Sequence, residues 1–144
     1  MFETPITVVG RVVTDVTTKH TATGEKVVGF RIACQERRFD KNLSTWVDGD
    51  RMYLGVSCWR RLGDNVATTL SKGDQVVVTG RFRVHERTNE DGGVRPMPEI
   101  DARSVGPDLA WHTVIINRSS WQARSDQLEL VAPPATEEGV DKAA

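Results

Sequence analysis

Hydrophobic and polar residues alternate along much of the chain, most clearly between Met52 and Trp59. One side of this segment carries Met52, Leu54, Val56 and Cys58, and the other side carries Tyr53, Gly55, Ser57 and Trp59. A period of two residues is typical of a strand that buries one of its faces. The segment therefore predicts a strand whose outer face presents Tyr53 and Trp59.

The next segment changes to the spacing of a helix. Its apolar residues share one helical face and are Leu62, Val66, Ala67 and Leu70. Gly73 is expected to end this helix in a left-handed conformation. The β-branched run from Gln75 to Thr79 then predicts a return to strand.

The same patterns along the whole chain predict five strands, with one short helix between the third and the fourth. The strands are expected over residues 6–16, 26–36, 51–59, 75–85 and 96–105. A polar turn region is expected over 17–24, a long polar loop over 37–50 and a hairpin loop over 86–95. Two prolines, Pro96 and Pro98, suggest an edge position for the fifth strand. This order of elements indicates an all-β fold, a five-stranded oligonucleotide-binding barrel.

The barrel is expected to occupy residues 1–107, and two further segments follow it. Residues 108–131 are expected to form a C-terminal strand extension or hairpin for subunit contact, with one strand over 111–118 and a weaker one over 125–131. Trp111 and Trp121 lie in this extension, where packing or subunit contact is the expected role. Residues 132–144 begin at a polar stretch around Pro133 and Pro134 and predict a disordered tail.

The distribution of charged and aromatic residues indicates a function for this fold. The formal net charge is −1, but residues 1–107 carry 16 Lys and Arg against 14 Asp and Glu, while residues 108–144 carry 3 against 6. Several basic residues stand beside aromatic ones on the predicted strands, as in Trp59-Arg60-Arg61 and Arg81-Phe82-Arg83. Single-stranded nucleic acid offers π-faces and phosphates together, so this pairing favours a single-strand binder.

Other function classes find little support in the sequence. The three His residues have no metal-ligand spacing, the two Cys residues form no CxxC pair, and no phosphate loop or nucleophile motif is present. We therefore expect no enzymatic activity, no metal and no cofactor. Cys34 and Cys58 are expected to be reduced and buried. No apolar run is long enough to span a membrane and no secretory signal is seen, which leaves a cytoplasmic location as the expectation.

Several fragments, taken in order, resemble bacterial single-stranded DNA-binding proteins, most closely the actinobacterial members. They are ITVVGRVVTD, GFRIACQERR, TWVDGDRMYLGVSCWRRLGDNVATTLSKGDQVVVTGRFR and TNEDGG, and together they cover residues 5–106. The resemblance implies an oligonucleotide-binding barrel that forms a homotetramer. It also implies a protein that protects and wraps single-stranded DNA without sequence choice during replication, recombination or repair, in association with the nucleoid.

The resemblance also implies which residues contact DNA. It places stacking aromatics at Phe39, with a one-residue ambiguity against Arg38, and at Tyr53 and Trp59. The expected basic contacts are Arg37, Arg61, Lys72, Arg81 and Arg83. A fourth aromatic common in the family is replaced here by Arg87, which can stack on a base and pair with a phosphate. Trp46 is a further candidate.

Each of these residues has a structural alternative. Trp59 can cover the helix as part of the core, and Trp46 can pin its loop. Arg61 and Lys72 can be solvated residues at the two ends of the helix. Arg87 and Arg95 can be ordinary hairpin charges.

Two other functions remain open at this point. The barrel can act as a protein-docking adaptor in a replication or restart complex, or it can bind RNA. The chain ends in ATEEGVDKAA, without the acidic, aromatic-tipped terminus of family members that recruit repair and replication proteins. We therefore expect weak or absent recruitment through the tail, and an accessory role.

Overall fold

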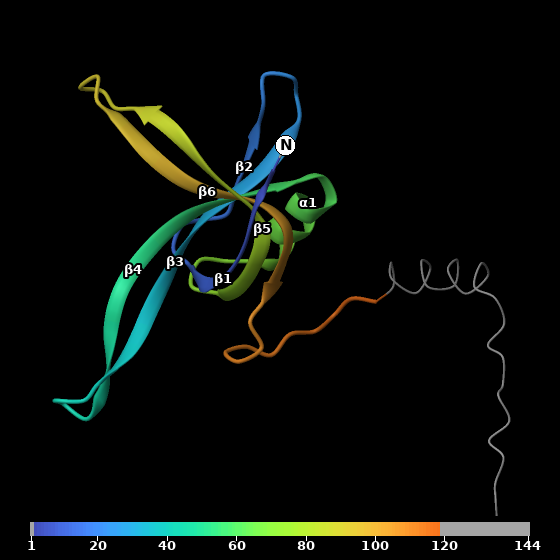
Figure 1. Ribbon diagram of the computed structural model, residues 1–144. Coiled ribbons are helices and arrows are strands. Elements are labelled where there is room, and N and C mark those ends of the chain that lie inside the picture. Colours follow the sequence, from blue (N-terminus) through green and yellow to red (C-terminus); the bar gives the residue numbers. More distant parts are fainter. Residues whose placement is uncertain (1, 119–144) are drawn as a thin grey trace, which may run out of the picture. The chain divides into compact units, whose positions relative to one another are not determined.

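The computed structural model describes residues 2–118, and residues 1–113 and 114–144 form two separate units. The first unit contains β1 (Thr4–Val12), β2 (Thr17–His20), β3 (Lys26–Asp40), β4 (Thr45–Trp59), α1 (Arg60–Thr69), β5 (Gln75–Thr88) and β6 (Val94–Pro107) (Figure 1). One short helix thus lies between the third and fourth of the predicted strands, which are β4 and β5. The predicted all-β fold is confirmed.

The strands close into a ring. Their order is β1-β5-β6-β4-β3-β2, and β1 also pairs with β3 where Arg11 faces Ala33 and Val12 faces Ile32. All pairings are antiparallel except that of β4 with β6, which joins Gly55–Ser57 to Glu99–Asp101. Pro96 and Pro98 pair with β5 just before this parallel contact begins, so they lie where β6 has one neighbour. The fifth predicted strand, β6, is therefore an edge strand only around these two prolines and has neighbours on both sides from Glu99 to Asp101.

The interior of the ring is apolar. Its buried side chains are Val12, Val28, Phe30, Ile32, Leu54, Val56, Cys58, Val66, Leu70, Val76, Val78 and Ile100. The predicted alternation holds from Leu54 to Cys58, but Met52 is 45% exposed because it lies beyond the end of the barrel. Among the described residues no polar or charged side chain is buried in this core.

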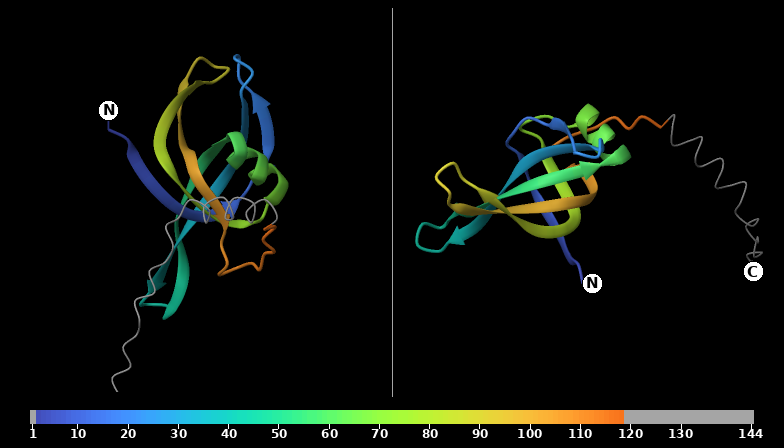
Figure 2. Two further views of the ribbon diagram at one scale, coloured as in Figure 1. Left: turned by 90° about the vertical axis from the view of Figure 1, so that its right-hand side faces the viewer. Right: turned by 90° about the horizontal axis from the view of Figure 1, so that it is seen from above.

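Two segments expected to be loops are largely strand. The polar region after residue 16 contains β2, whose four exposed residues pair with Lys26–Gly29 of β3. Most of the expected loop over residues 37–50 continues β3 and β4 as a hairpin, which turns at residues 41–44. This hairpin and the β5–β6 hairpin extend beyond the barrel as separate arms (Figure 2). Neither arm buries an apolar face, so alternation predicted the β5–β6 hairpin only as far as residues 85 and 96 and gave no sign of the strands within residues 37–50.

The helix ends earlier than Gly73. Residue Leu70 is already extended, and its N–H donates to the Val66 carbonyl oxygen. Gly73 does have a positive φ of 100°, but it belongs to the turn over residues 71–74 that leads into β5. The predicted conformation of Gly73 is confirmed, whereas its predicted position at the helix end is wrong.

At Gly80 the chain of β5 passes very close to β6. The register shifts between Thr79 and Gly80, so that β6 contributes an extra residue, Arg103, at this point. A Cβ on Gly80 would lie 2.2 Å from the Asp101 carbonyl oxygen and 2.8 Å from the Ala102 Cα. Both neighbours are backbone atoms, so this irregularity depends on glycine.

The segment after β6 is hydrogen-bonded to Gln75, the first residue of β5. The Asp108 N–H donates to the Gln75 carbonyl oxygen, and the Gln75 N–H donates to His112 Nε2 over 2.8 Å. The strand predicted over residues 111–118 is wrong for the single chain: residues 109–111 form a turn and residues 112–118 have no regular structure. A strand needs a neighbouring strand for its backbone hydrogen bonds. The strand predicted over 125–131, Trp121 and the predicted tail lie outside the described residues.

Because Cys58 is buried, the stability of the fold should decrease as the pH rises in the alkaline range. Desolvation, helped by the nearby Asp101 carboxylate, raises the pKa of the Cys58 thiol to about 12. In the unfolded chain the pKa of a Cys thiol is about 8.5. Below that pH the thiol is neutral in both states, and its contribution to the free energy of unfolding is fully present. As pH rises from there toward 12, the free energy of unfolding should fall by up to about 1.4 kcal/mol per pH unit from this group. Urea unfolding between pH 8 and about 10 measures this slope, which Cys58→Ala should reduce.

Candidate nucleic-acid interface

The side chains that alternate with the core form a continuous outer face over β3, β4, β6 and β5. On β4 this face carries Tyr53, Gly55, Ser57 and Trp59, because Leu54, Val56 and Cys58 point inward. The cross-strand register brings Gly55 beside Glu99 of β6, and Glu99 beside Arg83 of β5. Residues from four strands therefore share one surface next to the two predicted stacking rings.

Tyr53 presents an accessible ring at one end of this surface. Its side chain is 44% exposed. The guanidinium carbon of Arg31, from β3, lies 5.9 Å from the ring centroid, within the range of a cation–π contact. The Tyr53 hydroxyl is also within 3.4 Å of an Arg51 nitrogen. An exposed ring with one cation near its face and another at its hydroxyl can stack on a base while the cations reach the adjoining phosphates.

Trp59 lies at the other end of β4 in a basic pocket. The pocket has a volume of about 570 Å³ and is lined by Glu25, Lys26, Trp59, Arg60, Leu62, Ala102 and Arg103. Two of its cations are paired with carboxylates, Lys26 with Asp64 and Arg103 with Glu3. Trp59 is half-buried and directly precedes α1, so it both covers the helix and lines an open pocket. Trp59 can therefore pack against the helix and still offer part of its ring to a base.

The outer face of β5 carries a row of basic residues whose surroundings change along the strand. Near the barrel, Arg81 pairs with Asp101 at 3.1 Å and Arg83 with Glu99 at 3.7 Å, each directly across β6. Toward the hairpin, Arg87 instead faces Arg95. Like charges directly opposite each other destabilise a strand pair. Arg87 and Arg95 therefore offer two neighbouring cations to a phosphate, in a hairpin end that also carries Glu86, Glu90 and Asp91.

The β3–β4 hairpin brings two other predicted residues together. Phe39 and Trp46 are cross-strand partners with ring centroids 5.7 Å apart in an edge-to-face arrangement, and they are 50% and 60% exposed. Arg37, on the same hairpin, pairs with Asp48 at 3.1 Å. Exposed rings on an arm with neighbouring Arg residues suit contact with an extended strand.

Arg61 and Lys72 are not gathered with these groups. Both are exposed, Arg61 in the first turn of α1 and Lys72 in the turn that follows its other end. A ten-residue helix is about 15 Å long, so Lys72 lies far along α1 from Trp59. The predicted residues thus fall into an outer-face group, two hairpin groups and two isolated cations.

Sequence reasoning did not single out several cations of this candidate interface, namely Lys19, Lys26, Arg31 and Arg103. Alternation on β3 gives a signal for Arg31, since Phe30 and Ile32 point inward and Arg31 must point outward. Its proximity to Tyr53 depends on the register of β3 against β4, which alternation does not determine. Lys19 lies on β2, which was not predicted.

Residues 2–118 contain neither a candidate metal site nor a candidate membrane span. No group of three or more His, Cys, Asp or Glu residues in this range could hold a metal ion. No helix there has the length and apolarity needed to cross a bilayer.

Comparison with known proteins shows close similarity over the barrel. The model of the single-strand binding protein family matches residues 4–108. The single-stranded DNA-binding protein of Corynebacterium glutamicum is 38% identical over 117 residues, which cover 81% of this chain and 52% of that protein. Single-stranded DNA-binding protein 2 of Streptomyces coelicolor is 37% identical over 122 residues, which cover 85% and 61%. The chain thus spans between half and two thirds of the length of these relatives.

Solved structures agree with this similarity. The crystal structure of a small single-stranded DNA-binding protein from Streptomyces coelicolor matches with a TM-score of 0.70 and 37% identity, over 78% of this chain and 100% of that one. The second such protein from Mycobacterium smegmatis matches with a TM-score of 0.59 and 34% identity, over 81% and 99%. The family model covers well over half of the chain, and the predicted resemblance is confirmed: the chain belongs to the single-strand binding protein family.

Proposed function

We propose that the chain binds single-stranded DNA with little sequence choice and protects it during replication, recombination or repair. The observation that carries this proposal is the outer face of β4, which exposes a ring near each end, each with cations beside it: Tyr53 with Arg31, and Trp59 with Lys26 and Arg60. Tyr53 and Trp59 are six residue steps apart on one strand, a distance of about 20 Å. That span suits several nucleotides of an extended strand.

The mechanism combines stacking with phosphate pairing. Bases stack on Tyr53 and Trp59, and on Phe39 and Trp46 where the strand crosses the β3–β4 arm. Phosphates follow Arg37, Arg61, Lys72, Arg81, Arg83 and Arg87. Stacking tolerates every base, because every base has a π-face. We expect no catalytic activity, in keeping with a family of DNA-binding proteins.

Competition among nucleic acids tests this function. Labelled oligo(dT) should bind tightly, and unlabelled duplex DNA should compete poorly because its bases are already stacked. Oligo(dU) and oligo(U), which differ only in the 2′-OH, test the RNA alternative, because a protein specific for RNA must contact that hydroxyl and none of the proposed contacts uses it. Clearly tighter binding of oligo(U) than of oligo(dU) would favour the RNA alternative. The adaptor alternative predicts that no oligonucleotide binds tightly.

Arg87 is expected to act through charge. Each phosphate neutralised on a single strand contributes about 0.7 to the slope of log affinity against log salt. Arg87→Gln should therefore flatten that slope by about 0.7 for each engaged subunit, whereas Arg87→Lys should keep it. Titrations of oligo(dT) at four or more salt concentrations measure the slope. An Arg87→Gln variant with the wild-type slope would show that Arg87 is a solvated hairpin residue that does not contact a phosphate.

A homotetramer is part of the proposal, with the segment after Thr113 helping to hold it. Val114, Ile115 and Ile116 form an apolar run of exposed residues that a solvated linker would not need. A chain ending at Thr113 keeps the bonds of Asp108 and His112 to Gln75, so its barrel should remain stable. Native mass spectrometry should nevertheless show a weaker tetramer.

The matched control for this truncation is a chain ending at Val131, which removes the tail alone and should assemble like the full chain. Equal assembly of both truncations would assign the tetramer to the barrel. We also propose that the protein is located in the cytoplasm, in association with the nucleoid. Its tail should recruit partner proteins weakly or not at all. Retention of repair or replication proteins by the full chain, lost in the chain ending at Val131, would contradict the last point.

A further inference from the structure

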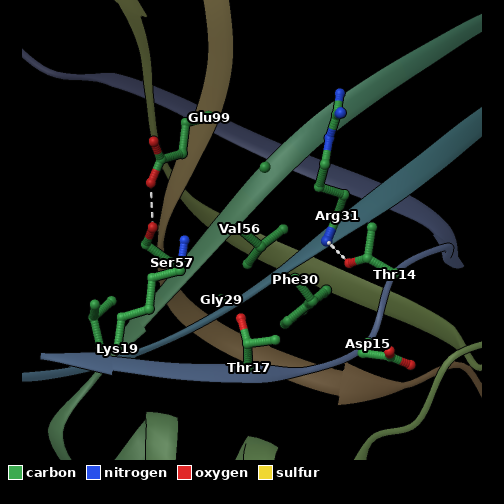
Figure 3. A pocket seen from close by; sticks show the side chains of 12 residues that line it. Thr14, Asp15, Thr17, Lys19, Gly29, Phe30, Arg31, Val56, Ser57 and Glu99 are labelled. Carbon is green, nitrogen blue, oxygen red and sulfur yellow. Dashed lines mark hydrogen bonds between the residues drawn. The ribbon is translucent and has the colours of Figure 1, made fainter. Parts of the chain in front are cut away.

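A hollow of about 460 Å³ lies on the outer face where β2, β3, β4 and β6 meet. Its volume falls within the range of small-molecule sites. Polar side chains surround it, among them Lys19 from β2, Arg31 from β3, Ser57 from β4 and Glu99 from β6 (Figure 3). The hollow lies between the two proposed stacking rings, since Gly55 and Ser57 stand between Tyr53 and Trp59 on β4.

The floor of the hollow is kept low by two glycines. Gly29 and Gly55 are diagonal neighbours on β3 and β4, because Gly29 faces Ser57 and Arg31 faces Gly55. Neither glycine has a positive φ. A Cβ would come no closer than 3.6 Å to its neighbours at Gly29 and 3.5 Å at Gly55, which is ordinary contact.

Neither backbone conformation nor packing therefore requires glycine at these two positions. A glycine inside a strand costs stability, about 0.5–1 kcal/mol relative to alanine. Glycines in strands often mark the close approach of a ligand. A flat floor on an otherwise polar surface is a place where a planar ring can lie against the sheet.

Two cations at the rim suit the backbone of a bound nucleotide. Arg31 Nε is buried and has no hydrogen-bond partner within the described part of the chain. Lys19 forms no ion pair among residues 2–118. Within residues 2–118 neither cation has a carboxylate partner, so each can pair with a phosphate without breaking an existing ion pair.

Glu99 is the carboxylate on the β4–β6 side of the hollow, which Asp15 lines from the segment before β2. Its side chain is 22% exposed, and one carboxylate oxygen accepts a hydrogen bond from the Ser57 hydroxyl. Arg83 lies 3.7 Å from the same oxygen and His85 Nε2 lies 3.4 Å from the other. A carboxylate has about four lone-pair directions, so it can accept a further bond from a ligand.

We propose that this hollow seats one nucleobase of the bound strand and that Glu99 makes it favour cytosine over uracil or thymine. The proposal rests on the single-strand binding function and adds a base preference to it. Cytosine offers its N4 amino group to the carboxylate, a known pairing for Glu. Uracil and thymine place the O4 oxygen at that position, and two acceptors face each other there. Ser57 can turn its hydroxyl toward cytosine N3.

The test compares oligo(dC) with oligo(dU) of equal length, so that no methyl group distinguishes the bases. The full chain is titrated at pH 8 and fixed salt, and the ratio of the two dissociation constants is measured. A hydrogen bond to a charged group predicts that Glu99→Gln lowers the preference for dC about tenfold or more. Gly29→Val, which fills the floor, should lower it similarly. N4,N4-dimethylcytosine in the oligomer should abolish the preference of the unaltered protein.

Two controls match these variants. Asp101→Asn removes a carboxylate on the same face of β6 that also pairs with an Arg, yet it does not line the hollow, so the dC:dU ratio should stay unchanged. Gly106→Val adds the same side chain to a strand glycine with open space around its Cβ and should bind as the unaltered protein does.

The outcomes separate the two proposals. Tight binding of both oligomers with a ratio that Glu99→Gln and Gly29→Val leave unchanged would overturn the base preference alone. A ratio that Asp101→Asn shifts as much as Glu99→Gln would assign the effect to general charge and would also overturn it. Failure of the unaltered protein to bind either oligomer would overturn the single-strand binding function together with the preference.

Discussion

Trp59→Ala should weaken binding of oligo(dT) by about 5- to 150-fold, because each base stacked on an aromatic ring contributes about 1–3 kcal/mol. Trp59 is the ring with the most cations around it, namely Lys26, Arg60 and Arg103, so a base lost there also loosens its phosphates. Binding of oligo(dT) to the unaltered protein should quench tryptophan fluorescence, and the variant should lose most of that quenching. Anisotropy and fluorescence titrations at one salt concentration measure both effects.

Two controls accompany this substitution. Trp59→Phe keeps a ring over the start of α1 and should retain most of the affinity. Trp111→Ala removes a tryptophan that is 67% exposed and lies outside the outer face, so it should bind oligo(dT) like the unaltered chain. A folded Trp59→Ala protein with unaltered affinity would remove Trp59 from the interface.

Gly80→Ala should cost about 3 kcal/mol of folding stability, at the upper end of the usual cost of overpacking. The new Cβ would meet the backbone of Asp101 and Ala102 at distances that real Cβ atoms do not show, and no side-chain rotation can relieve the contact. The strands β5 and β6 must then separate at the point where the register shifts. For a domain of this size the melting temperature should fall by roughly 10 °C or more.

The comparison variant for Gly80→Ala is Gly106→Ala. Gly106 lies in β6 as well, but a Cβ there has open space around it, so its melting temperature should stay close to that of the unaltered chain. Both variants are compared at one protein concentration, since assembly also affects melting. Equal melting of the two would mean that the irregularity at Gly80 adapts to a side chain.

The barrel was predictable because its core residues alternate strictly. Val28, Phe30 and Ile32 on β3 and Leu54 and Val56 on β4 each leave one polar or small residue between them, and a period of two fixes both the strand and its buried face. The strand β2 was not predictable in this way. Its residues, Thr17 to His20, are all exposed, and hydrogen bonding to β3 alone makes them a strand.

The same limit applies to the interface. Tyr53 and Trp59 could be placed on one face by counting along a single strand. The proximity of Arg31 to Tyr53, and that of Glu99 to Ser57, arises between residues of different strands. Only the register of β3 and β6 against β4 brings such groups together, and alternation leaves that register free.

The closure of the ring through β6 has a consequence for how the chain folds during synthesis. The three residues that join β6 to β4 are Glu99–Asp101, and β5 must already stand between β6 and β1. Until residue 101 has left the ribosome, β4 and β5 have no strand between them, and the core is open on that side. Such non-local pairing is slow, on the order of milliseconds to seconds. The nascent chain should therefore expose its β4 and β5 edges to pairing with other chains until residues 99–101 have emerged and paired.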